Sequence, residues 1–322
     1  MMQTDTSPSP KTPDEDFYRR GQMRRWGGLL LLVGVVWLVF ELTSRGSLFG
    51  LGLGFVERSA DTPARSFAAA RLVVRGASDN ISLERAPTGD TITVAVVRHG
   101  FGWNADAAGA AVGRLDVKMT QSGDTLQVEV SRAGFAGFIG RSPYVDLRIS
   151  VPDGVALDVQ TVSGDLSADG LRADGSLSTT SGAIDLADSS GALQVQTVSG
   201  DITLGGASGL LRVRSISGDI ALRDLRDARL DLESTSGDIA VTGSLADGQQ
   251  STISNISGGV HVRLPAAADL RLNASTVSGD LSSDLDLRDA LRERRSLSGT
   301  VGVGKTTLTI STTSGDIEVS GK

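Results

Sequence analysis

The C-terminal half of the chain carries a repeated pattern of apolar and small polar positions. Ser-Gly pairs recur at spacings of 16 to 21 residues. Three residues after each serine stands an aliphatic residue, and two residues before it stands Thr, Ser or Asn. Four residues before the serine an apolar residue recurs, with Arg294 as the exception. The nine pairs begin at Ser163, Ser181, Ser199, Ser217, Ser236, Ser257, Ser278, Ser298 and Ser314.

This pattern predicts a stacked β architecture. Apolar positions alternate within a unit, which is the period of a strand with one buried face. The Ser-Gly-Asp between two strands predicts a corner, because Gly accepts positive φ and Asp bonds nearby backbone amides. Stacked units, ~4.8 Å apart, bury a continuous apolar face that no single unit can bury. We therefore predict an all-β chain in which residues 156–322 form a β-solenoid similar to a parallel β-helix.

The column of Thr, Ser and Asn has the same strand parity as the apolar positions. We expect these side chains to face inward near the corner. Stacked hydroxyl groups would then satisfy one another, since each can donate and accept.

Residues 66–155 are also strand-like but less regular. Residues 71–74, 91–94, 115–117 and 126–130 each have the composition of a strand, and Ser122-Gly123-Asp124 resembles the corner. The Gly- and Ala-rich segment 100–113 predicts a loop. We interpret the region as irregular first turns or a sandwich-like cap, which would cover one open end of the solenoid. Near the other end, the charged stretch 284–295 predicts a short helix or a bulging loop.

The N-terminal segment predicts a membrane anchor. Residues 1–25 read as a disordered tail that ends in four arginines, and residues 26–40 are uncharged and mostly apolar. Extended to residue 44, this run approaches the ~20 residues that a transmembrane helix needs. The alternative is a cleaved signal, but no small-x-small cleavage site follows closely. The positive-inside rule then predicts a single-pass cell-membrane protein with a cytoplasmic N-terminus, a linker at 45–65 and an extracytoplasmic β domain.

Composition narrows the function classes. The net charge of −7 disfavours a nucleic-acid partner, because binding to phosphates needs a basic surface. The chain has no Cys, which excludes disulfides, thiolate zinc sites and cysteine nucleophiles.

Residues 145–154 (VDLRISVPDG) and 161–166 (TVSGDL) resemble the bacterial β-strand-repeat family catalogued as a "putative adhesin" domain of unknown function. The resemblance covers residues 66–322. It implies an envelope-tethered binding domain, sometimes found beside envelope-stress signalling systems, and it carries over no catalytic residue.

One motif matches the phosphate-binding P-loop. Residues Gly299–Thr306 fit G-x-x-x-x-G-K-T. That chemistry needs a strand before the loop and a helix after it, whereas residues 307–311 alternate like a strand. We therefore expect no nucleotide site.

The Asp residues of the corners form a second candidate. Aligned carboxylates repel one another, and a divalent cation would relieve that repulsion. However, Ala183, Gly259 and Thr300 interrupt the column, so we interpret these residues as solvated turn formers and predict no metal or cofactor. The column contains Asp165, Asp201, Asp219, Asp238, Asp280 and Asp316.

Charged clusters that could serve a glycan-active β-helix enzyme are the third candidate. We interpret the carboxylates and arginines between residues 223 and 233 as an outer loop and face. The two histidines, His99 and His261, fit no catalytic spacing, so we predict no catalytic residue. The charges are Arg223, Asp224, Arg226, Asp227, Arg229, Asp231 and Glu233.

The sequence thus favours a non-enzymatic envelope-anchored solenoid that binds cell-wall glycan or another envelope protein. The first alternative is an accessory or sensor protein in envelope-stress signalling. A glycan-active enzyme is the second alternative.

Overall fold

The computed structural model describes residues 56–133 and 142–321. The predicted tail (1–25) and transmembrane helix (26–44) lie outside the described residues, as does the linker up to residue 55. Within the described ranges, no helix has the length and apolar character needed to cross a membrane.

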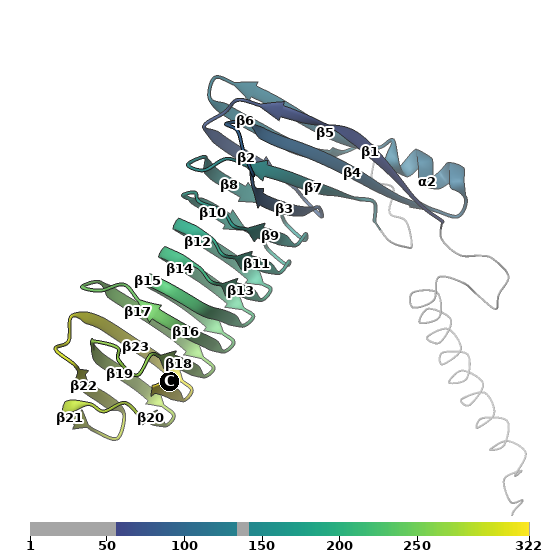
Figure 1. Ribbon diagram of the computed structural model, residues 1–322. Coiled ribbons are helices and arrows are strands. Elements are labelled where there is room, and N and C mark those ends of the chain that lie inside the picture. The colour runs from purple at the N-terminus through teal and green to yellow at the C-terminus, as the bar shows by residue number, and fades with distance from the viewer. Residues whose placement is uncertain (1–55, 134–141, 322) are drawn as a thin grey trace, which may run out of the picture.

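The central coils form two rows of parallel strands that run side by side along the molecule (Figure 1). Each coil gives one strand to each row, and β15 turns the corner and belongs to both. The first row contains β8 (Ala156–Gln160), β10 (Gly175–Ser178), β12 (Ser190–Ser199), β14 (Ser208–Ser217), the end of β15 (Ile220–Ser236) and β17 (Gln250–Ser257). The second row contains β9 (Leu166–Asp169), β11 (Ile184–Ala187), β13 (Ile202–Gly205), the start of β15, β16 (Ile239–Leu245) and β18 (Val260–Leu264). The predicted all-β solenoid is confirmed.

The register of these strands aligns the sequence columns in space. Ile184 pairs with Ile202, which pairs with Ile220 in the next coil, and all three are fully buried. Full burial of one such side chain stabilises the fold by ~1.5–3 kcal/mol. The aliphatic columns therefore fix the stacking, because a slip of one residue would turn each of them outward.

The Thr, Ser and Asn column faces inward, as predicted, with side chains 4–6% exposed. Its hydrogen bonds differ from the expectation. Thr179 Oγ1 donates to the carbonyl of Gly164 at 3.3 Å, and Thr276 Oγ1 donates to that of Gly315 at 3.2 Å. These two hydroxyls bond corner carbonyls of the adjacent coil, whereas Ser215 and Ser234 donate to carbonyls of their own corner. Thr197 and Thr312 have no hydrogen-bond partner within the protein.

At the N-terminal end, one coil lies out of chain order. The coil of β2 (Arg71–Arg75) and β3 (Asn80–Arg85) sits between β8–β9 and the later coil of β6 (Thr125–Arg132) and β7 (Tyr144–Val151). Antiparallel strands β1 (Val56–Phe67), β4 (Ile92–Gly102) and β5 (Leu115–Ser122) flank these coils. β1 thus begins inside the range that the sequence assigns to the linker.

Two expectations for this region were wrong. The segment 100–113 contains a helix, α2 (Ala105–Val112), because Asn104 caps its first turn by accepting a hydrogen bond from the Ala107 amide at 2.8 Å. Ser122-Gly123-Asp124 forms the hairpin turn between the antiparallel strands β5 and β6 and is not a solenoid corner. Gly123 supplies the positive φ that the turn requires.

The C-terminal end repeats this out-of-order arrangement. The last coil, β23 (Thr306–Ser314) and β24 (Ile317–Gly321), lies between β17–β18 and the earlier coil of β19 (Leu270–Ser278) and β20 (Leu281–Ser283). The antiparallel strands β22 (Ser296–Val301) and β21 (Arg288–Arg292) extend the first row beyond β19.

Two further expectations fail here. Ser298-Gly299 is not a corner, because both residues lie within the antiparallel strand β22. Arg294, which breaks the apolar column, lies just before this strand. The stretch 284–295, expected as a helix or loop, contains the edge strand β21. Its irregular pairing with β22 coincides with a positive φ at Asp289.

Candidate binding groove

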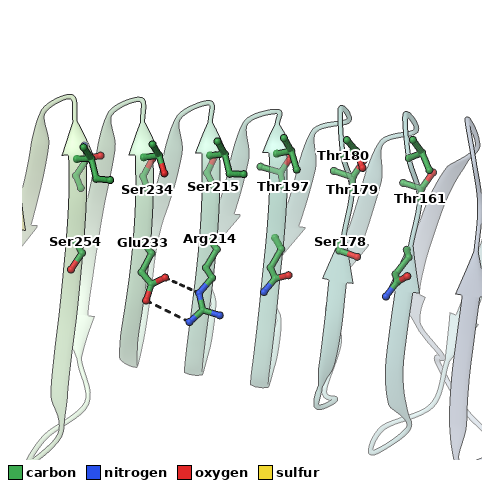
Figure 2. A pocket seen from close by; sticks show the side chains of 18 of the residues that line it. Thr161, Ser178, Thr179, Thr180, Thr197, Arg214, Ser215, Glu233, Ser234 and Ser254 are labelled. Atoms are coloured by element: carbon green, nitrogen blue, oxygen red, sulfur yellow. Dashed lines mark hydrogen bonds and ion pairs between the residues drawn. The ribbon is translucent and has the colours of Figure 1, made fainter.

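A groove of about 740 Å³ runs along the solenoid beside the Ser-Gly corners (Figure 2). It crosses seven coils, from Arg75 and Gly76 to Ile256, so its length is about 29 Å at ~4.8 Å per coil. Three aligned columns of side chains line it between β8 and β17.

Each column takes one position of the repeat. The floor column is Thr161, Thr179, Thr197, Ser215, Ser234 and Asn255. The corner column is Val162, Thr180, Val198, Ile216, Thr235 and Ile256. The polar column is Gln160, Ser178, Gln196, Arg214, Glu233 and Ser254.

Strand parity explains the hollow shape. The polar column points outward from the sheet, the floor column points inward, and the corner column points outward again where the chain turns. The inward position therefore lies between two raised edges. In Figure 2 the floor residues Thr161, Thr197 and Ser234 line up across successive strands.

The corner column exposes aliphatic side chains to solvent. Val162, Val198, Ile216 and Ile256 are 41–54% exposed, and Val277 continues the column beyond the groove. A single exposed Val or Ile is ordinary, but a stripe of them in four of the six coils between β8 and β17 is a feature of interaction surfaces.

The charges in and beside the groove are already paired. Arg75 binds the carboxylate of Asp158 through two nitrogens at 3.0 and 2.7 Å, and Arg214 Nε lies 2.9 Å from Glu233. The hydrogen bond from Arg75 lowers the pKa of Asp158, and the bond to Glu233 raises the pKa of Arg214. The groove therefore presents ion pairs with little net charge.

Two polar atoms lie unmatched beneath the floor. Thr197 Oγ1 and Asn255 Oδ1 are buried and lack a hydrogen-bond partner within the protein. Asn255 uses its amide nitrogen for the carbonyls of Gly237 and Gly258, which leaves its oxygen unmatched. Buried polar atoms of this kind are uncommon, and these two lie below the surface that a ligand in the groove would touch.

The sequence did not single out the groove, although a signal was present. The residue directly before each corner serine should point outward, yet it is Val or Ile in most copies. An outward apolar column marks a candidate interface once the coils are known to stack in register.

The P-loop match begins in β22 and continues through the loop 302–305, which leads to β23 on the other side of β19; a strand follows the motif, as predicted. The amides of Val303, Gly304 and Lys305 point at one acceptor, Oδ1 of Asp269, at 2.9, 2.5 and 3.2 Å. Burial raises the pKa of Asp269, but these three hydrogen bonds and the Lys305 charge outweigh it and hold the pKa below its usual value. The backbone nest that could hold an anion is filled by the chain's own carboxylate.

The corner aspartates bond the backbone of the next coil. Asp201 Oδ1 accepts a hydrogen bond from the Asp219 amide at 3.0 Å, and Asp219 Oδ1 accepts one from the Asp238 amide at 2.9 Å. Asp165, Asp238 and Asp316 make the same contact. In the parts of the chain that the structure describes, no group of three or more His, Asp or Glu side chains could hold a metal ion.

The remaining candidates do not converge on a site. Asp224 and Asp227 have positive φ in the bends of β15, and Arg226 pairs with Asp188 at 3.0 Å on the surface. His261 points outward toward Glu318 at 3.2 Å. His99 stacks on Tyr144 and lies 3.0 Å from both Glu57 and Asp146, far along the chain from the solenoid repeats.

Together, the fold and groove define a two-row β-solenoid with interleaved end coils. Residues 76–320 match the family described as Toastrack DUF4097, so the chain belongs to that family, and the resemblance seen in the sequence is confirmed. No curated protein matches the chain.

The solved structures that this chain resembles share little sequence with it. A "putative adhesin" from Bacteroides fragilis has 13% identity and a TM-score of 0.44, covering 81% of this chain and 97% of its own. A "putative adhesin" from Parabacteroides distasonis has 10% identity and a TM-score of 0.40, covering 81% and 97%. A "putative lipid binding protein" from Parabacteroides distasonis has 13% identity and a TM-score of 0.39, covering 80% and 96%.

Proposed function

We propose that this protein is a non-enzymatic binding module, anchored in the cell membrane by residues 26–44, with its β domain outside the cytoplasm. The groove carries the proposal: an exposed aliphatic column faces a polar column across a row of buried Thr, Ser and Asn side chains. The titratable groups beside it are paired with one another. That arrangement suits recognition and offers no free acid, base or nucleophile.

The partner that fits these walls is an extended polypeptide of another envelope protein. At ~3.3 Å per residue, the groove accommodates about nine extended residues. Apolar side chains of such a segment would pack on the corner column, and its backbone groups would bond the hydroxyls and amides opposite. The paired arginines disfavour a polyanion, because neither is free to neutralise a phosphate.

A cell-wall glycan is less well matched to the same walls. From Val145 onward the sequence contains no Phe, Tyr or Trp, so the groove offers no flat aromatic ring for a sugar to pack against. A glycan is therefore the second outcome that the test must distinguish.

The test uses the full chain in lipid nanodiscs and a phage-displayed library of random decapeptides. Ile216→Arg places a charge in the corner column, whereas Ala240→Arg places the same charge on exposed β16 in the other row. We expect selected peptides to bind the wild type and Ala240→Arg equally and to lose at least about tenfold affinity for Ile216→Arg, ~1.4 kcal/mol.

Two results would count against this proposal. Peptides that bind both arginine variants equally would show that the groove is not their site. Purified glycan strands that bind the wild type and lose binding to Ile216→Arg, without any selected peptide, would replace the polypeptide by a glycan.

A further inference from the structure

The aromatic residues of the described chain gather in the N-terminal cap. Four occur there, Phe67, Phe101, Trp103 and Tyr144, and none follows in the coils. Trp103 is 53% exposed, which is unusual for a large apolar ring. Since Trp is enriched where protein meets the headgroups of a bilayer, its position relative to the membrane anchor matters.

Trp103 lies beside the start of β1. β1 and β4 are antiparallel, with Val56 opposite Gly102, the last residue of β4, so Trp103, which follows β4, lies close to the first described residue. Val56 is itself 38% exposed. Both apolar side chains therefore lie where the chain arrives from its N-terminal segment.

α2 completes the same end of the cap. It packs closely on β4, because a Cβ at Gly102 would collide with the backbone of Ala107 and Ala108. Its exposed residues are small, with Asp106 as the one charge among Ala105, Ala107 and Ala110. Figure 1 shows α2 beside the ends of β1 and β4, at the end of the cap away from the stacked coils.

The linker between the proposed transmembrane span and Val56 is short and carries one charge, at Arg45. Eleven residues, 45–55, separate Val56 from the proposed span, and none between 46 and 55 is charged. Fully extended, they reach at most about 40 Å, and their Leu and Phe residues favour the bilayer interface over water. The end of the cap that contains Trp103 is thus held near the membrane.

We propose that this end of the cap, formed by Val56, Trp103 and the exposed alanines of α2, rests on the phospholipid interface with the Trp103 indole at headgroup level. The inference rests on the proposed anchor. Contact there would restrict how the solenoid is oriented relative to the membrane surface.

The chain has three tryptophans, which makes the contact measurable. In the full chain, Trp26→Phe and Trp37→Phe leave Trp103 as the only indole. The protein is reconstituted in liposomes of phosphatidylcholine and phosphatidylglycerol, with and without a headgroup-nitroxide phospholipid. The matched control adds Trp103→Phe and Val303→Trp, which moves the indole to a 77% exposed site at the far end of the solenoid.

We expect nitroxide lipid to quench Trp103 at least about twofold more than the Val303→Trp probe, with a blue-shifted emission for Trp103 in liposomes. Equal quenching of the two probes, in protein that floats with the liposomes and resists alkaline extraction, would overturn the contact and leave the anchor standing. Protein that fails to float would overturn the anchor, and the contact would fall with it.

Discussion

The two ends of the solenoid share one topology but differ in what holds it. At the N-terminal end, β2–β3 lies between β8–β9 and β6–β7, and at the C-terminal end, β23–β24 lies between β17–β18 and β19–β20. In both, a coil is inserted between two neighbours, one of which is remote in chain order, and antiparallel strands cover the outer edge. An interleaved coil cannot peel off alone, because it bonds a coil on each side.

The N-terminal coil is held by a buried ion pair. Asp79 is fully buried, and its carboxylate accepts hydrogen bonds from Arg132 at 2.6 Å, from the Val145 amide at 3.0 Å and from the Ala77 amide at 2.9 Å. Since Ile81 pairs with Leu166, Asp79 takes the place of the corner glycine, Gly164. It joins the corner of β2–β3 to β6 and β7.

The C-terminal coil is held by Asp269, which lies directly before β19. Its carboxylate accepts hydrogen bonds from three backbone amides of the loop before β23, a group of contacts that we call the Asp269 nest. No opposite charge is buried with it. The inserted coil is thus held by a buried charge pair at the N-terminal end and by hydrogen bonds from backbone amides near solvent at the C-terminal end. Removing one partner of the charge pair should destabilise the fold strongly, whereas removing Asp269 should have a smaller and more local effect.

The largest effect is expected for Asp79→Ala, which leaves Arg132 without its buried partner. We expect a loss of about 3–5 kcal/mol in the free energy of unfolding, measured by urea denaturation of the full chain in micelles. The double variant Asp79→Asn/Arg132→Met removes both charges and should recover most of that loss. A double variant no more stable than Asp79→Ala would mean that the charge pair is not what holds this end.

A smaller and more local effect is expected for Asp269→Ala. The amides of Val303, Gly304 and Lys305 lose their shared acceptor but can turn to water, so amide exchange there should speed up several-fold. Exchange in the central strand β13 should be unchanged. Equal acceleration in both segments would show that the nest supports the whole solenoid and not its end.

The Asp269 contacts should make the C-terminal end of the solenoid sensitive to acid. The pKa of Asp269 is depressed in the folded state, so its stabilising effect is present above the unfolded value of about 3.9 and is lost as pH falls through the folded value. Below about pH 4, the protection of amides in the loop 302–305, corrected for the intrinsic exchange rate, should fall before protection in β13 does. Asp269→Asn should remove that acid step, and an acid step that persists in the variant would assign it to another group.

The sequence was sufficient to predict the coils but not their order. The aliphatic column places Ile317 beside Val260 as readily as beside Leu281, because every slot in the row offers the same register. Edges of identical pattern cannot specify which coil comes next, and Ser298-Gly299 matched the motif while lying in an antiparallel strand. The helix α2 was missed for a related reason, since a run of Gly and Ala carries no amphipathic signal.

The groove was predictable only in part. The outward Val and Ile column is visible in the sequence, and the Arg214–Glu233 pair follows from the repeat, because the two residues occupy the same position in adjacent coils. The Arg75–Asp158 pair does not, because these residues are 83 residues apart. Their proximity depends on the out-of-order insertion of β2, so the pairing at that end of the groove could not be predicted from the repeat alone.

The smallest loss of stability is expected for a substitution in the regular coils between the two ends. Asp201→Ala removes a single hydrogen bond to the Asp219 amide, at a corner that keeps its other contacts. We expect a loss of about 0.5–1.5 kcal/mol by urea denaturation.

Ala183→Asp is the matched gain, because Ala183 is a natural gap in the same column. Its new carboxylate would reach the Asp201 amide one coil on, as Asp165 reaches the Ala183 amide at 2.9 Å. We expect stability to rise by up to about 1 kcal/mol, offset in part by repulsion from Asp165 and Asp201. If the variant is less stable than the wild type at low salt and more stable at high salt, repulsion between the carboxylates outweighs the new hydrogen bond at low salt. The gap at Ala183 would then reduce the repulsion within the row of aspartates.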